Sequence, residues 1–225
     1  MGISYAPAVQ VRSGAERATL VRRTYGLVFL GILATLAGTA FTLAQPGLLS
    51  AVAAHPFITM IATFIPLIMV QRSAREYPKN IILTFLFTFV MGVMIAPGMY
   101  LAERAVPGVV MQAGLLTFAA FGALSLYAVF SRRDFSAWGA FFFVGLIVLL
   151  VASFLNYFMQ SVAVGLFLSG VGVFIFSGLL VFDTWRIVRS GAYGQDDYVF
   201  AAVTIYLDLL NLFMFILSLL GGRRR

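Results

Sequence analysis

Two of the eight acidic residues lie inside long apolar runs, where an ionisable side chain is costly. Asp183 stands near the end of one run, and Asp208 stands about ten residues into the next. At the helical rise, ten residues place Asp208 roughly 15 Å into a membrane, near its middle. The other acids fall in a polar arm or in connecting segments: Glu16, Glu76, Glu103, Asp134, Asp196 and Asp197. Asp183 and Asp208 are therefore the first candidates for function.

The two acids can meet, because their runs are consecutive and joined by only about ten residues. Two such helices can pack as an antiparallel hairpin with the carboxyls facing each other. Carboxyls that meet in a low-dielectric interior share a proton and titrate as a pair, which is the property of a pH sensor. Polar residues at spacings of 4, 3 and 7 form one face of the last helix, which we expect to point into the protein: Thr204, Asp208, Asn211 and Ser218.

Each acid also has a structural interpretation. Asp183 can form an i,i+3 ion pair with Arg186 at the membrane boundary. Asp208 has no cation within one helical turn. It is then either a permanently protonated carboxyl hydrogen-bonded to a neighbour, or the partner of a group on another helix.

The remaining residue types argue against several classes of protein. The sequence has no cysteine, and its single histidine, His55, precedes Pro56 at the start of an apolar run. Intramembrane zinc proteases need a histidine pair and serine proteases need a histidine at depth, so we expect no enzyme. The one lysine, Lys79, lies in a connection, which argues against a retinal Schiff base. The net charge of +7 is scattered over helix ends, so no nucleic-acid partner is expected. We also expect no resident cofactor, with calcium as a possible transient ligand.

The composition predicts the surroundings of these residues. Of 225 residues, 62% are hydrophobic and 10% charged, against roughly 45–50% and 25% in soluble domains. Strands of membrane barrels are short and alternate strictly, whereas the apolar runs here are long and uninterrupted. The sequence therefore predicts an all-α integral membrane protein with seven transmembrane helices. The runs occupy residues 24–44, 57–71, 81–101, 109–130, 137–157, 160–187 and 198–220.

Basic residues predict the orientation, because cytoplasmic connections collect Lys and Arg. We expect a cytoplasmic N-terminal arm of residues 1–23, a seven-helix domain of residues 24–221 and a basic tail of residues 222–225. With seven spans the tail lies outside; either so short a tail is translocated, or the last segment does not fully cross. The residues assigned to the cytoplasmic side are Arg12, Arg17, Arg22, Arg23, Arg72, Arg75, Lys79, Arg132, Arg133, Arg186 and Arg189.

Several segments resemble the transmembrane Bax-inhibitor motif family, in order and over nearly the whole chain. The most specific is Thr-Ile-Tyr-Leu-Asp-Leu-Leu-Asn-Leu-Phe at residues 204–213, followed by Leu-Ser-Leu-Leu-Gly at 217–221. Residues 91–97 resemble the third helix of that family, residues 131–136 its basic central loop, and residues 182–184 its sixth-helix acid.

The resemblance implies a seven-helix bundle with a central C-terminal helix, in a bacterial plasma membrane. It implies that Asp183 and Asp208 form a pH-sensing pair over a calcium leak, held closed by the shared proton and by an arginine of the second helix. Arg72 or Arg75 would match that arginine. Some relatives carry an acid in the second helix, but residues 56–71 contain none, so calcium entry or selectivity could differ. Bacterial relatives are also associated with a membrane AAA protease that they restrain.

Two functions therefore remain open. The first is a pH-sensitive calcium leak in which Asp183 and Asp208 are sensor and weak calcium ligands. Calcium prefers six to eight oxygen ligands, so the pair with supporting groups would form the weak site that permeation requires. The alternative is a non-conducting regulator of a membrane AAA protease, of membrane-protein quality control or of a stress response of the cell-death type. A proton-coupled transporter is less well supported, because no inverted repeat is evident. The supporting residues in the first case are Arg72, Arg75, Arg186, Thr204 and Asn211.

Overall fold

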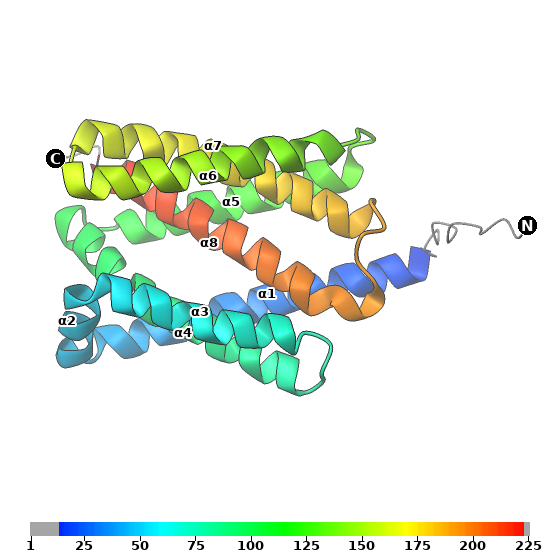
Figure 1. Ribbon diagram of the computed structural model, residues 1–225, viewed down its shortest axis with the longest axis horizontal. Coiled ribbons are helices and arrows are strands. Elements are labelled where there is room, and N and C mark those ends of the chain that lie inside the picture. The colour runs from blue at the N-terminus through cyan, green and yellow to red at the C-terminus, as the bar shows by residue number, and fades with distance from the viewer. Residues whose placement is uncertain (1–13, 223–225) are drawn as a thin grey trace, which may run out of the picture.

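The computed structural model describes residues 14–222 and forms a bundle of long helices (Figure 1). All elements in this part of the chain are helical, which confirms the predicted all-α membrane bundle. The elements are α1 (Gly14–Leu43), α2 (Pro46–Ala54), α3 (Pro56–Arg72), α4 (Lys79–Ala105), α5 (Val109–Phe130), α6 (Ser136–Met159), α7 (Val162–Val188), the 3-10 turn η1 (Gln195–Asp197) and α8 (Tyr198–Gly222).

The second predicted span has a different form from the others. Within the described residues, six helices are long and apolar enough to cross a membrane, and the pair α2 and α3 could supply a seventh. These two helices meet at His55 and are bent by 98°. Pro46 and Pro56 begin them, at the helical position where proline is favourable. The sequence predicted no helix between the apolar runs 24–44 and 57–71, so α2 was missed.

The expected N-terminal arm also differs, because α1 already begins at Gly14. Residues 14–23 of that arm belong to α1, and Leu20 is completely buried against the other helices. The boundary at residue 23 reflected where the charged residues stop, whereas the helix continues through them. The rest of the expected arm, including Arg12, and the tail residues 223–225 lie outside the described residues.

Charge is distributed unevenly between the two ends of the bundle. Figure 1 shows that the start of α1 and the connections α3–α4, α5–α6 and α7–α8 lie at one end. This end carries the basic residues that the sequence analysis assigned to one side, including Arg22, Arg75 and Arg132. We call it the basic end. Its cytoplasmic location stays a prediction.

Helices α1 and α4 approach closely because glycines and threonines line their contact. Gly38 and Gly92 each lie against the backbone of the other helix, so that a Cβ at either position would overlap backbone atoms. Thr39 Oγ1 donates to the Gly92 carbonyl oxygen at 3.0 Å, and Thr35 Oγ1 lies 3.0 Å from the Thr88 carbonyl oxygen. Small residues are a common basis of helix association in lipid, where burial of apolar surface drives little.

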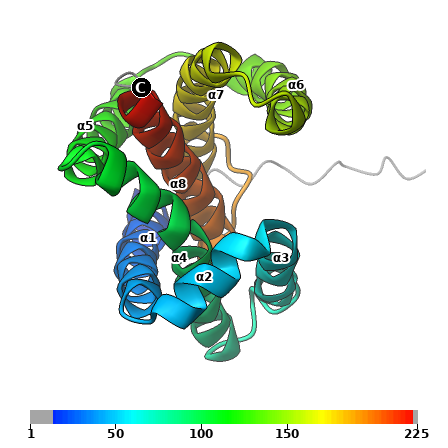
Figure 2. The same ribbon diagram turned by 90° about the vertical axis from the view of Figure 1, so that its left-hand side faces the viewer.

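Helix α8 lies in the middle of the bundle, surrounded by α1, α4, α5 and α7 (Figure 2). Ile205 and Leu212 on α8 are completely buried. The hydroxyl of Tyr206 lies 2.6 Å from Thr35 Oγ1, which joins α8 to the contact between α1 and α4. The predicted central C-terminal helix is therefore confirmed.

The close contact of α1 with α4 can be tested by a substitution that adds one methyl group at the contact. Gly92→Ala is expected to lower the thermal unfolding temperature in detergent, because overpacking a tight contact costs about 1–3 kcal/mol. Gly170→Ala on α7 is the control, since no atom lies within 4 Å of a Cβ there and alanine favours helix. It should leave the unfolding temperature unchanged or raise it. Equal losses in the two variants would contradict the close contact.

Candidate functional site

Asp183 on α7 and Asp208 on α8 face each other inside the bundle. Each residue is only 5% exposed, and the two side chains are close enough to form a carboxyl–carboxyl hydrogen bond when one carries a proton. Asp208 stands ten residues after the start of α8, or about 15 Å, and Asp183 stands five residues before the end of α7, or about 8 Å. The oblique course of α8 in Figure 1 offsets this difference in depth.

Arg186 supplies the positive charge next to this pair. Its Nη1 lies 3.1 Å from Asp183 Oδ1, and the two side chains are 36% and 7% exposed. The guanidinium also lies over the rings of Phe182 and Tyr193, at 5.4 and 5.1 Å from their centroids. Asp183 therefore contacts a cation of its own helix and a carboxyl of the next helix. The structural and functional interpretations of Asp183 are thus compatible.

Tyr193, which the sequence analysis did not place at the site, covers the pair from the connection between α7 and α8. Its ring lies under the Arg186 guanidinium, 5.1 Å from the ring centroid, and its hydroxyl lies near Thr204 on α8. Burial raises the pKa of the Tyr193 hydroxyl, and the nearby Arg186 guanidinium partly opposes that effect. Tyr193 therefore stays a neutral hydrogen-bonding group at physiological pH.

The predicted polar face of α8 is only partly directed at the acids. Asn211 Nδ2 donates to the Leu207 carbonyl at 2.8 Å, and Thr204 Oγ1 donates to the Phe200 carbonyl at 3.0 Å. Asp208 Oδ2 is buried and accepts no hydrogen bond from the described residues.

The described part of the chain has no group of three or more His, Asp or Glu side chains placed to hold a metal ion. Two carboxyls can exchange a proton or meet a partly hydrated cation. They do not complete the shell of a tightly bound calcium ion.

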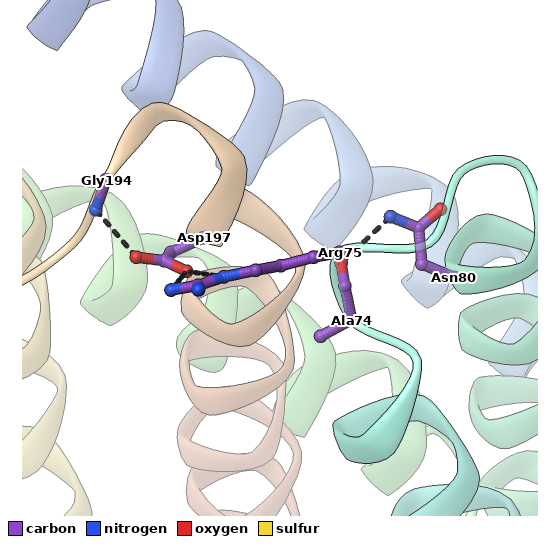
Figure 3. A network of polar contacts seen from close by, with 5 residues as sticks. All are labelled: Ala74, Arg75, Asn80, Gly194 and Asp197. Carbon is purple, nitrogen blue, oxygen red and sulfur yellow. Dashed lines mark hydrogen bonds and ion pairs between the residues drawn. The ribbon is translucent and has the colours of Figure 1, made fainter.

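The two arginines that the resemblance pointed to lie away from the pair. Arg72 is exposed at the end of α3. Arg75 binds Asp197 at the start of α8, with Nη2 at 2.7 Å and Nε at 2.9 Å from Oδ1 (Figure 3). Among the described residues the cation bound to Asp183 is therefore Arg186, from the same helix.

The Arg75–Asp197 contact belongs to a larger network that joins the α3–α4 connection to α8. The other oxygen of Asp197 accepts from the Gly194 amide at 2.7 Å, and Asn80 Nδ2 donates to the Ala74 carbonyl at 2.9 Å (Figure 3). Sequence reasoning missed this network. The only sequence feature that indicates the network locally is Asp197, an acid three residues after Gly194 and just before a helix.

Cavities lie at both ends of α8, with the acid pair between them. The cavity at the basic end has about 610 Å³ and is lined by Tyr198 at the start of α8. The cavity at the other end has about 490 Å³ and is lined by Met214, Leu217 and Ser218. Asp183 and Asp208 line neither cavity, so the buried middle of α8 separates the two.

A helical membrane bundle with a central C-terminal helix and two apposed intramembrane aspartates defines a recognisable class of integral membrane protein. Comparison with known families assigns it. The family model described as inhibitor of apoptosis-promoting Bax1 matches residues 17–225, and the chain belongs to this Bax inhibitor-1 family.

Relatives in bacteria, viruses and animals match over almost the whole chain. A membrane protein of Vibrio cholerae is 34% identical over 92% of this chain and 90% of its own length. The Golgi anti-apoptotic protein of vaccinia virus is 33% identical over 96% of this chain and 91% of its own length. Protein lifeguard 4 of the mouse is 30% identical over 96% of this chain and 90% of its own length. The family assignment of the sequence analysis is therefore confirmed.

The contact between Arg186 and Asp183 can be tested with two variants, one that removes only the cation and one that removes both charges. Arg186→Gln should destabilise the protein at neutral pH by about 1–2 kcal/mol, because it leaves a buried carboxylate without its cation. This is less than for a fully buried pair, since Arg186 is 36% exposed. The double variant Asp183→Asn/Arg186→Gln should recover most of the loss in thermal unfolding experiments in detergent.

The same measurement at acidic pH supplies the control. Protonation of Asp183 then removes the unpaired charge, so the difference between single and double variant should shrink. A double variant as unstable as Arg186→Gln at neutral pH would show that Arg186 acts by packing alone.

Proposed function

We propose that this protein is a pH-sensitive, low-flux cation pathway of the calcium-leak type, without enzymatic activity, in which Asp183 and Asp208 sense pH. The observation that carries the proposal is the apposition of the two buried carboxyls on neighbouring helices. A single structural ion pair would need only Asp183 and Arg186. A second carboxyl in the same place adds a group whose charge depends on pH.

The proton count of the pair controls the force between α7 and α8. With one shared proton, the pair carries one negative charge, which Arg186 balances. Loss of that proton puts two like charges at close range in a medium of low dielectric constant, where repulsion is strong. Because α8 contacts α1, α4, α5 and α7, any displacement of α8 alters its contacts with four other helices at once.

The two cavities at the ends of α8 support a route past the pair. In the described structure the middle of α8 is sealed by buried side chains such as Ile205, Leu209 and Leu212. Under the proposal this corresponds to a closed form. Opening would connect the cavities and bring a cation to Asp208 Oδ2, which lacks a hydrogen-bond donor among the described residues. Few fixed ligands imply weak binding, which suits passage rather than storage.

We place the protein in a bacterial plasma membrane with its N-terminus in the cytoplasm. The support is the basic end, which carries Arg22, Arg75 and Arg132, because cytoplasmic ends of membrane proteins collect basic residues. The bacterial relative from Vibrio cholerae is consistent with this location.

The proposed sensor predicts the outcome of a flux experiment. In liposomes loaded with a calcium dye, calcium flux through the wild-type protein should rise with pH, because loss of the shared proton makes the two carboxyls repel each other and displaces α8. Asp208→Asn removes the coupling and should reduce that change to less than about half. Asp183→Asn should have the same effect.

Asp134→Asn is the matched control for this experiment. Asp134 is an exposed acid that accepts a hydrogen bond from the Ser136 amide at 2.8 Å, and asparagine can accept the same bond. It should keep the wild-type pH profile. A profile that Asp208→Asn leaves unchanged would refute the sensor, and no flux from any variant would refute the pathway.

A regulatory role is the second candidate, and the names of two relatives favour it. The vaccinia virus protein is named anti-apoptotic, and the mouse relative is named lifeguard 4. We propose as the alternative that the N-terminal arm contacts a partner such as a membrane AAA protease, and that nothing is conducted.

Deletion of residues 1–13 separates the two candidates. The deletion stops before α1, because Leu20 is completely buried and a longer deletion would damage the bundle. If the arm contacts the protease, cross-linked protease should co-purify with the full chain and not with the shortened one. Unchanged co-purification would contradict an arm-mediated contact, and calcium flux should persist if the bundle conducts.

A further inference from the structure

The cavity at the basic end of α8 has the features of an anion-binding site. It is lined by three arginines that come from two elements distant in sequence: Arg22 and Arg23 on α1, and Arg75 in the connection between α3 and α4. Guanidinium groups bind phosphate oxygens through two parallel hydrogen bonds, which makes converging arginines well suited to a phosphate.

Charge remains available in this cavity after its internal contacts are counted. Arg75 is bound to Asp197, and its side chain is still 70% exposed. Arg23 lies over the ring of Tyr198 at 5.6 Å from the centroid, a contact that orients the side chain without neutralising it. Asp196, which is exposed, adds one negative charge to the lining. Three arginines against two acids, Asp196 and the Asp197 that binds Arg75, leave one net positive charge at the cavity.

The apolar part of the lining points to a lipid rather than to a soluble anion. Leu27, Leu30 and Ile81 line the same cavity, and Leu30 is 45% exposed. From Arg23 to Leu30 the helix advances about 10 Å, which is the step from the headgroup region to the acyl chains. A free phosphate would use only the arginines, whereas a phospholipid would use both parts.

We propose that this cavity binds the phosphate headgroup of an anionic phospholipid, with an acyl chain lying against Leu30 and Ile81. Basic pockets between helices at the membrane surface are a recurrent form of lipid recognition. The site is distinct from the acid pair and does not depend on whether the protein conducts ions.

Native mass spectrometry of the detergent-purified protein measures this binding directly. Wild type titrated with phosphatidylglycerol should retain one lipid more strongly than with zwitterionic phosphatidylcholine. Arg22→Gln/Arg23→Gln should weaken retention of phosphatidylglycerol roughly tenfold or more, given the contribution of each basic residue near a membrane surface. Arg132→Gln/Arg133→Gln is the matched control, because it removes two exposed arginines at the same end of the bundle but outside the cavity.

Three results would overturn the proposal. In the first, the control variant loses the lipid as strongly as the cavity variant. In the second, phosphatidylcholine binds as well as phosphatidylglycerol. In the third, inorganic phosphate displaces the lipid when both are present at the same millimolar concentration. The last result would identify a site for soluble anions.

A third variant is expected to bind the lipid more strongly, so that misfolding of the arginine double variant cannot by itself explain the results. Asp196→Asn removes the exposed acid from the lining and should strengthen retention of phosphatidylglycerol severalfold. A loss of retention in Asp196→Asn would contradict the electrostatic basis of the site.

Discussion

The high cost of a charge inside an apolar bundle governs the arrangement of this protein. Asp208 lies in the buried middle of α8, and lipid cannot solvate it. Only the interior of the bundle offers a partner, so α8 must be surrounded by other helices. The carboxyl that meets Asp208 comes from α7, and Arg186 balances the charge from the basic end. The central position of α8 and the placement of the acid pair are therefore two consequences of one constraint.

The same constraint explains how the other polar residues are accommodated. Hydroxyl groups of α1 and α4 bond to carbonyl oxygens at a helix contact, as Thr39 does with Gly92. Thr204 and Asn211 bond to carbonyls of their own helix. A hydroxyl or amide group can donate a hydrogen bond to a backbone carbonyl one turn away in its own helix. A carboxylate only accepts hydrogen bonds, so it needs a donor or a shared proton. Acids are for this reason more informative about function than other polar residues in such a helix.

Much of this arrangement could be predicted because its signals are local. Uninterrupted apolar runs predicted the long helices to within a few residues at most ends, and the short connection between α7 and α8 predicted that Asp183 and Asp208 could meet. The missed features depend on geometry. Arg75 and Asp197 are 122 residues apart and meet only because α3 ends and α8 begins at the same side of the bundle. The family resemblance implied that Arg75 could lie at the acid pair. Arg75 instead stands in the connection after α3, which places it beside the start of α8.

The two proposed sites share α8, and their separation limits how they can influence each other. Tyr198 at the lipid cavity and Asp208 at the acid pair are ten residues apart, or about 15 Å along the helix. A lipid phosphate in this cavity would be largely neutralised by the arginines that bind it, so its direct electrostatic effect on Asp208 would be small. Coupling would instead require that α8 has two positions and that the lipid contacts them differently. The Arg75–Asp197 ion pair lies where such a difference would arise, because it joins the start of α8 to an arginine that lines the lipid cavity.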